Sequence, residues 1–249
     1  MSESGPAGSR VALVTGAGSG IGEAVAHALA RAGWRTILCG RNRQRLDEVA
    51  AALAAPALPC PVDLTDAAAV SGLLGTVPEA FRPVSLLVNC AGHDAGGRRP
   101  FEAGTAEEWV DILQANLVGL VRLTHLVVQQ MIGRGAGDIV NIGSLSALRP
   151  APRMAAYNAS KAGVHAFSDV LRADLGRHDI RVIEIMPGLT QTNFVRSRLR
   201  GDADAARQFY DKVPTRLAAQ DVADAVIYAI GQPRHVVVAQ LVLVPSSQW

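Results

Sequence analysis

A glycine-rich turn near the N-terminus is the feature that most constrains the fold. The apolar run Arg10–Thr15 leads directly into residues 16–22 (GAGSGIG), and a helical pattern follows over Gly20–Ala32. Glycines permit a tight turn and a close approach of the backbone to a bound group, while the helix start offers free N–H groups and a positive dipole end. A strand, a glycine turn and a helix in this order predict a site for the pyrophosphate of a dinucleotide.

The rest of the chain alternates short β-branched runs with alanine-rich helical stretches. The predicted strands are Arg10–Thr15, Thr36–Cys39, Ala57–Pro61, Ser85–Asn89, Asp138–Ile142, Arg181–Met186 and Val237–Val244. The predicted helices are Gly20–Ala32, Arg43–Ala54, Ala67–Ala80, Ala106–Ile132, Met154–Gly176 and Gln220–Gly231. Such alternation is typical of βαβ units, and continuous apolar runs fit strands that are buried on both faces. We predict an α/β fold: a single Rossmann-type domain with a doubly wound parallel sheet of about seven strands and helices on both faces.

One segment departs from this alternation. Leu189–Pro214 separates a predicted strand from the next clear helix and carries three arginines between residues 196 and 200. A doubly wound sheet holds its substrate beyond the carboxyl ends of its strands, so we expect a substrate lid around residues 189–214. A solvated helix face is the simpler interpretation of the arginines. Residues 10–249 are expected to form one domain, and residues 1–9 a flexible tail.

Composition narrows the classes of function. The net charge is +2, and lysines and arginines are scattered along the 249 residues, which gives no case for a nucleic-acid partner. No unbroken apolar run reaches the roughly 18 residues that cross a bilayer, and the first residues lack a secretory pattern. Cys39, Cys60 and Cys90 have no CxxC or paired-histidine spacing, so we expect reduced thiols and no metal site. We therefore expect a cytoplasmic globular protein that binds no membrane.

The end of the second predicted strand indicates which dinucleotide binds. NAD sites carry an acid there for the ribose 2′-hydroxyl, whereas an arginine accommodates the 2′-phosphate of NADP. Residues 38–43 (LCGRNR) contain no acid, and Arg41 follows the strand directly. A guanidinium pairs with a phosphate, which a carboxylate would repel. NADP(H) is therefore favoured over NAD(H), although Arg41 and Arg43 also suit the solvated start of a helix.

Three further polar residues are candidates for contacts with this end of the cofactor. Ser19 and Asn42 are placed to add neutral hydrogen bonds to the phosphate. Asp63, at the end of the third predicted strand, has two interpretations. It either accepts a hydrogen bond from the adenine amino group or caps the helix expected to start near Thr65.

An ordered set of motifs resembles the short-chain dehydrogenase/reductase family. In chain order the motifs are TGxxxGIG at 15–22, Asn-Cys-Ala-Gly at 89–92, Asn116 in a long helix, Ile-Gly-Ser at 142–144, Tyr157-x-x-x-Lys161, and Pro187-Gly188 followed by Thr192. Their order and spacing cover nearly the whole chain and are far more specific than any single motif. Cys90 replaces the second asparagine of the family's turn. Many members end near Gly-Gly, but residues 243–249 (LVPSSQW) are similar to the NADP-dependent branch that contains serine and allo-threonine 3-dehydrogenases.

The resemblance implies a catalytic set of Asn116, Ser144, Tyr157 and Lys161. The implied reaction is hydride transfer between NADP(H) and a small carbonyl compound or secondary alcohol, with Tyr157 as general acid/base and no metal. A free tyrosine has a pKa of about 10, and a cation one helical turn away, such as Lys161, favours the phenolate. By the same resemblance Lys161 binds the nicotinamide ribose, Ser144 donates to the substrate oxygen, and Asn116 holds a water that relays protons.

The motifs also indicate which residues contact the two ligands. Cofactor contacts are expected from Gly16, Ser19, Gly20, Ile21, Gly22, Arg41, Asn42, Asp63, Leu64, Asn89, Ala91, Gly92, Tyr157, Lys161, Pro187, Gly188 and Thr192. Substrate contacts are expected from His93, Ser144, Leu145, Met154, Leu189 and Phe194. The apolar members of the second group suit ordinary packing as well, and His93 suits a loop. The two longest predicted helices resemble the family's dimer helices, which implies a homo-oligomer, either a dimer or a homotetramer.

Other functions on the same scaffold stay open. They are an NAD(H)-dependent member of the family, a non-redox dehydratase, epimerase or dehalogenase, and a protein that senses a dinucleotide without catalysis. A pure sensor has no need of an acid/base pair, so the complete catalytic set argues against it. Substrate loops vary freely on one fold, and the sequence therefore predicts the class of reaction better than the molecule that reacts.

Overall fold

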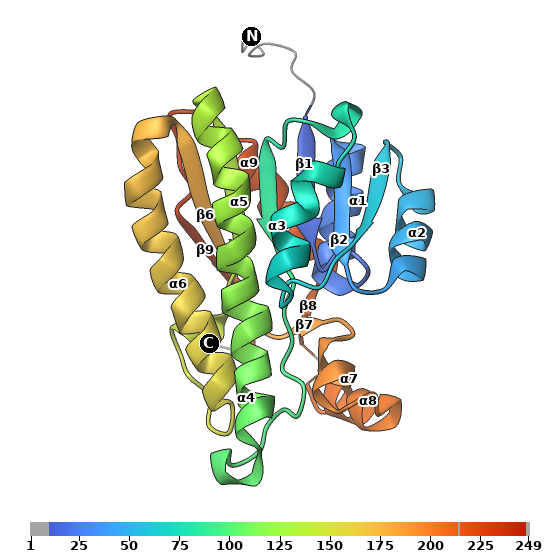
Figure 1. Cartoon of the computed structure of the whole chain (residues 1–249). Coiled ribbons are helices and arrows are strands. Elements are labelled where there is room, and N and C mark those ends of the chain that lie inside the picture. The colour runs from blue at the N-terminus through green and yellow to red at the C-terminus, as the bar shows by residue number, and fades with distance from the viewer. Residues whose placement is uncertain (1–9, 214, 248–249) are drawn as a thin grey trace.

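A doubly wound parallel sheet forms the centre of the molecule (Figure 1). The computed structural model describes residues 10–213 and 215–247. Seven strands lie in the order β3-β2-β1-β4-β5-β6-β9, and all six pairings are parallel. They are β1 (Val11–Thr15), β2 (Arg35–Gly40), β3 (Ala57–Pro61), β4 (Leu86–Asn89), β5 (Gly137–Ile142), β6 (Ile180–Pro187) and β9 (Gln240–Leu243). The predicted α/β class and the seven-stranded doubly wound sheet are confirmed.

Helices cover both faces of the sheet and enclose one apolar cluster on each side. Helices α1 (Gly20–Arg31), α2 (Arg43–Ala52) and α9 (Ala219–Ile230) bury their apolar side chains against one face. On the other face lie α3 (Ala67–Thr76), α5 (Gly119–Arg134) and α6 (Ala155–Leu175), which are in front of the sheet in Figure 1. The strands are buried from both sides, which explains why they read as continuous apolar runs.

The longest helical stretch changes its winding in the middle. Helix α4 (Ala106–Leu113) continues into α5 through a π-helical segment, Gln114–Val118. This segment turns Asn116 into the interior, where its side chain is fully buried. By length and composition only, the whole stretch from Ala106 to Arg134 is apolar enough to cross a membrane. A core helix passes the same test, and α5 packs its apolar side chains against the sheet.

The segment expected to form a lid contains structure that the sequence patterns did not predict. It holds β7 (Thr190–Gln191), α7 (Phe194–Arg198) and α8 (Ala203–Asp211), and β7 pairs with β8 (Leu217–Ala218). These elements lie beyond the carboxyl ends of the central strands, below the sheet in Figure 1. Residues 1–9, Pro214 and the last two residues lie outside the described part of the chain, so the expected tail is untested.

Most boundaries differ from the predictions by one or two residues, and two differ by more for identifiable reasons. The helix predicted over Ala67–Ala80 ends at Thr76, because Pro78 restricts the residue before it to extended conformations. The last strand was predicted over Val237–Val244 but is confined to Gln240–Leu243, the stretch that pairs with β6.

A buried ion pair joins β5 to β6. Arg181 donates from Nε to Asp138 Oδ1 at 2.7 Å and from Nη2 to Asp138 Oδ2 at 2.9 Å. The two side chains are only 4% and 10% exposed. Removing one partner of such a pair leaves a desolvated charge, which costs far more than an exposed pair contributes.

Asp138→Ala is expected to lower the free energy of unfolding by about 3–5 kcal/mol, because the Arg181 guanidinium stays buried without its carboxylate. Urea unfolding followed by circular dichroism measures the change. Arg207→Ala is the matched control, since Arg207 pairs with Asp204 on the surface; its effect should stay within about 0.5 kcal/mol. Equally small losses of unfolding free energy in both variants would show that burial does not make the Asp138–Arg181 pair more important than an exposed pair.

Candidate active site

A cavity of about 1130 Å³ opens at the carboxyl ends of the strands and collects most of the predicted site residues. The predicted residues that line it are Gly16, Ser19, Gly20, Ile21, Gly22, Arg41, Asn42, Asp63, Leu64, Ala91, Gly92, His93, Ser144, Leu145, Met154, Tyr157, Lys161, Pro187, Gly188, Leu189, Thr192 and Phe194. Two predicted residues, Asn89 and Asn116, do not line it. The cavity therefore runs from the glycine turn, past the Tyr157–Lys161 helix, to the segment after β6.

The glycine turn is held in place by close backbone contacts. Gly16 has a φ of +66°, and a Cβ there would lie 3.0 Å from the Cα of Ala91. A Cβ on Gly22 would lie 2.3 Å from the carbonyl oxygen of Gly16, so neither position has room for a side chain. Thr15 Oγ1 accepts hydrogen bonds from Cys90 N at 2.9 Å and Ala91 N at 3.0 Å. These contacts fix the turn after β1 against the turn after β4.

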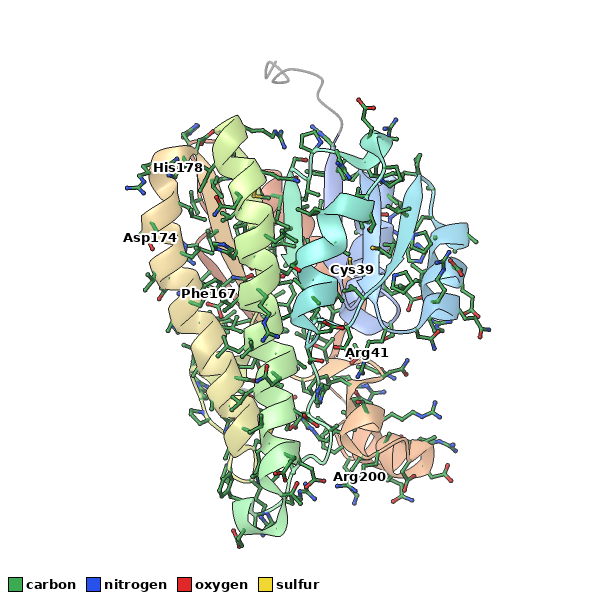
Figure 2. The ribbon with its side chains drawn as sticks, viewed as in Figure 1. Cys39, Arg41, Phe167, Asp174, His178 and Arg200 are labelled. Atoms are coloured by element: carbon green, nitrogen blue, oxygen red, sulfur yellow. The ribbon has the colours of Figure 1, made fainter. Side chains whose placement is uncertain are left out.

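The cavity wall near β2 offers polar groups that the protein itself does not use. Ser19 precedes α1 at the N-cap position, yet its side chain makes no capping hydrogen bond. Arg41 lines the cavity and forms no hydrogen bond or ion pair with any of the residues that the structure describes. Figure 2 shows Arg41 at the lower end of the sheet, above α7 and α8. Arg43, by contrast, pairs with Asp47 at 3.0 Å on the surface of α2. Of the two arginines, Arg41 is the one available to a ligand.

Asp63 does not cap the following helix, so that alternative is wrong. Asp66 caps α3 instead, since its carboxylate accepts from Ala68 N and Ala69 N. Asp63 Oδ1 accepts from the backbone N of Thr65 at 2.9 Å and from its hydroxyl at 2.7 Å. These hydrogen bonds lower the pKa of Asp63, so it remains a carboxylate at the cavity wall.

Ser144, Tyr157 and Lys161 converge on one end of the cavity, and all three are less than a tenth exposed. Burial raises the pKa of Tyr157, and a hydrogen bond with Ser144 acts in the opposite direction. Lys161 Nζ donates to the carbonyl oxygen of Ile142 at 2.8 Å and lies 6.0 Å from the centre of the Tyr157 ring. Burial lowers the pKa of Lys161 to about 8. The ring of Phe194, from α7, meets that of Tyr157 edge-on at 5.6 Å.

Asn116 lies behind the cavity wall and anchors it. Its Nδ2 donates to His93 O at 2.9 Å and to Ser160 Oγ at 3.1 Å, while its Oδ1 accepts from His93 N at 2.8 Å. Both amide hydrogens are therefore used within the protein. The π-helical segment places this side chain between α6 and the loop that carries His93.

Asn89 is also part of the support rather than of the cavity surface. Its side chain is 3% exposed and donates to Thr124 Oγ1 and Asn141 Oδ1, both at 2.9 Å. The amide thus ties the end of β4 to β5 and α5. Position 89 contributes to the cavity through the turn that it precedes.

The sequence patterns missed the charged residues that close the cavity. Arg198, expected on a solvated helix face, is only 10% exposed and pairs with the buried Asp94 at 2.8 Å. That expectation is wrong for Arg198, although Arg200, which pairs with Glu108, remains exposed. Arg98 also lines the cavity and was not predicted. The available signal was the glycine- and arginine-rich stretch at 96–99 (GGRR), which follows the Asn-Cys-Ala-Gly turn after three residues.

Comparisons with known proteins agree with this geometry. The family model described as short chain dehydrogenase matches residues 10–203. Sulfoacetaldehyde reductase 2 of Chromohalobacter salexigens is 39% identical over 243 residues, covering 96% of each chain. Serine 3-dehydrogenase of Agrobacterium fabrum is 34% identical over 236 residues, or 95% of this chain and 94% of that one. The structure of the closed form of a serine dehydrogenase complexed with NADP+ has a TM-score of 0.91 at 33% identity and covers 96% of both chains.

Ser144→Ala is expected to make Tyr157 ionise at higher pH, because the variant loses the hydrogen bond that favours the phenolate while burial still opposes it. The phenolate absorbance followed through an alkaline titration measures this ionisation. Subtracting the same titration of Tyr157→Phe removes the contributions of Tyr210 and Tyr228. Ionisation of Tyr157 at an unchanged or lower pH would contradict the contact with Ser144.

Proposed function

The chain belongs to the short-chain dehydrogenase family, and we propose that it interconverts a small carbonyl compound and an alcohol with NADP(H), using Tyr157 as the general acid/base. The observation that carries this proposal is the convergence of Ser144, Tyr157 and Lys161 on a cavity whose other end holds the glycine turn. Relatives named sulfoacetaldehyde reductase, probable NADP-dependent dehydrogenase and serine 3-dehydrogenase support both the small substrate and the redox reaction.

The residues present fit a dinucleotide that binds in an extended form. The closely packed glycine turn leaves backbone N–H groups at the start of α1 open to the pyrophosphate, and the Ser19 hydroxyl is free of the helix cap. The carboxylate of Asp63 is available to an adenine amino group. When bound, NADPH supplies the hydride that reduces the carbonyl carbon.

Tyr157 supplies the proton in this reaction. Burial raises the pKa of its phenol, so the side chain is protonated near neutral pH and suited to donate to the oxygen that becomes an alcohol. Ser144 donates a hydrogen bond to the same oxygen and stabilises its developing negative charge. The positive charge of Lys161 stabilises the phenolate that remains, because the cation lies one helical turn away.

Lys161 and Asn116 complete the proposed machinery. The Lys161 ammonium donates one hydrogen to Ile142 O, which leaves two donors for the ribose hydroxyls next to the nicotinamide. Asn116 uses both amide hydrogens on His93 and Ser160, so a water that relays protons to Lys161 would donate to the second lone pair of Asn116 Oδ1. The relay therefore depends on the carbonyl end of this side chain.

We further propose that residues 189–214 act as a lid. The described part of this segment is tied across the cavity mouth by two ion pairs, Arg198–Asp94 and Arg200–Glu108. Lids of this kind exclude water from hydride transfer and commit the substrate.

The exposed apolar side chains Val110, Val121 and Val170 on α4, α5 and α6 support a homo-oligomer that buries them.

Tyr157→Phe is expected to lower kcat/KM for NADPH-dependent carbonyl reduction by about 10²–10⁴-fold, because the phenyl ring cannot transfer a proton. Steady-state or stopped-flow assays that follow the decrease in NADPH absorbance measure the loss of activity. A fluorescence titration checks that NADPH still binds. Tyr228→Phe is the matched control, since Tyr228 is 59% exposed on α9. Near-normal turnover by Tyr157→Phe would rule out the mechanism.

Arg41→Gln is expected to lower kcat/KM for NADPH by about 10–100-fold and to leave kcat/KM for NADH nearly unchanged. The reason is the loss of a charge-assisted hydrogen bond, worth about 1.5–3 kcal/mol, to the 2′-phosphate. Arg43→Gln, whose arginine pairs with Asp47, should affect neither cofactor. Equal use of NADH and NADPH by the unaltered protein would refute the role of Arg41.

A further inference from the structure

Three arginines line the cavity near its catalytic end, namely Arg98, Arg149 and Arg198. The surroundings of Arg98 and Arg198 differ. Arg198 has its own counter-ion, because the buried Asp94 accepts from its Nε at 2.8 Å. The Arg198 guanidinium lies 5.3 Å from the centre of the Phe194 ring, which in turn contacts the Tyr157 ring edge-on. Arg198 therefore brings a compensated charge close to the reacting tyrosine.

Arg98 has no such counter-ion. Its one hydrogen bond among the described residues runs from Nε to the sulfur of Met154 at 3.4 Å, and thioether sulfur is a weak acceptor. No carboxylate within residues 10–213 and 215–247 lies within 4.0 Å of it. Partial burial and the nearby charge of Arg198 lower the pKa of Arg98, while the charge of Asp94 acts in the opposite direction. Arg98 is exposed to solvent, and it lines the cavity beside another cation with no described carboxylate in direct contact.

The contact with Met154 places Arg98 next to the catalytic end. Met154 is 4% exposed and belongs to the same buried apolar cluster as Tyr157 and Trp109. The neighbouring Arg99 points elsewhere, because it pairs with Glu108 and lies over the Trp109 ring. Of the two consecutive arginines, Arg99 therefore pairs within the protein, and Arg98 lines the cavity.

No carboxylate among the described residues pairs directly with Arg98, although the charge of Asp94 acts on it from a distance. Asp94 is occupied by Arg198, and Asp111, which also lines the cavity, acts on His93. Clustered like charges destabilise a folded chain, and such clusters occur where a ligand supplies the opposite charge. An oxyanion on the ligand would meet this requirement at Arg98.

We propose that the substrate carries an anionic carboxylate or sulfonate group, which binds to Arg98 while its carbonyl oxygen lies between Ser144 and Tyr157. This inference rests on the proposed function. Two oxygens of either anion match the fork of N–H donors on a guanidinium, so Arg98 both selects and orients the substrate. A neutral analogue cannot form this ion pair, so we expect the anion to react more efficiently.

Paired substrates with and without an anionic group test this proposal. We expect kcat/KM with NADPH to be at least about tenfold higher for 4-oxobutanoate than for its methyl ester, and for sulfoacetaldehyde than for acetaldehyde. Arg98→Gln should remove this preference by lowering kcat/KM for the anions and not for the neutral compounds. Arg98→Lys should restore part of it, because a lysine keeps the charge but not the fork. Arg31→Gln is the control, since Arg31 is exposed on α1 and contacts Gln220.

A binding measurement separates this proposal from the proposed function. Calorimetry with the protein saturated with NADP+ uses ethanesulfonate and propionate as non-reacting anions, and propanol as the neutral probe. Binding of the anions that Arg98→Gln weakens by at least about tenfold supports the site even if no carbonyl is reduced. Reduction of neutral carbonyls at the same efficiency as anions, or an undiminished anion preference in Arg98→Gln, overturns the site and leaves the redox function standing.

Discussion

Burial of the Lys161 ammonium group is the constraint on which the catalytic end of the molecule depends. Its hydrogen bond to Ile142 fixes α6 to the end of β5, and burial alone favours the neutral amine. Glu184, fully buried on β6, opposes that loss of charge, and His165 Nδ1 holds the Glu184 carboxyl at 2.8 Å. A Cβ at Gly143 would lie 2.4 Å from Glu184 Oε1, so only glycine fits there. The buried cation and the groups around it therefore link β5, β6 and α6 at the catalytic end.

Much of the fold and of the site could be predicted because both depend on local patterns. Continuous apolar runs identify strands buried on both faces, and a parallel sheet brings the carboxyl ends of all its strands to one edge. The ordered motifs therefore had to meet at that edge. Arg41 and Arg43 show the limit of this reasoning. Both also suit the solvated start of a helix, and only the structure shows that Arg43 pairs with Asp47 whereas Arg41 has no partner among the described residues.

The features that escaped prediction depend on contacts between distant segments. Asn116 points inward because a π-helical segment interrupts a regular helix, and no periodicity indicates that change. Arg198 is buried because Asp94, far away in the sequence, lies opposite it. Asp63 and Asp66 are both suitable helix caps, and only the position of the first helical residue distinguishes them. In each case the residue type indicated a polar contact, but the contacting partner depended on the tertiary structure.

The two ion pairs that hold residues 194–200 across the cavity respond differently to the solution. Arg200 is 63% exposed, so dissolved salt screens its attraction to Glu108. Arg198 and Asp94 are shielded from water, and counter-ions do not reach them while the segment is closed. Rising ionic strength therefore loosens the outer contact and spares the inner one. Opening of the proposed lid would therefore require the rehydration of the Arg198–Asp94 pair, whereas the Arg200–Glu108 pair weakens as the salt concentration rises.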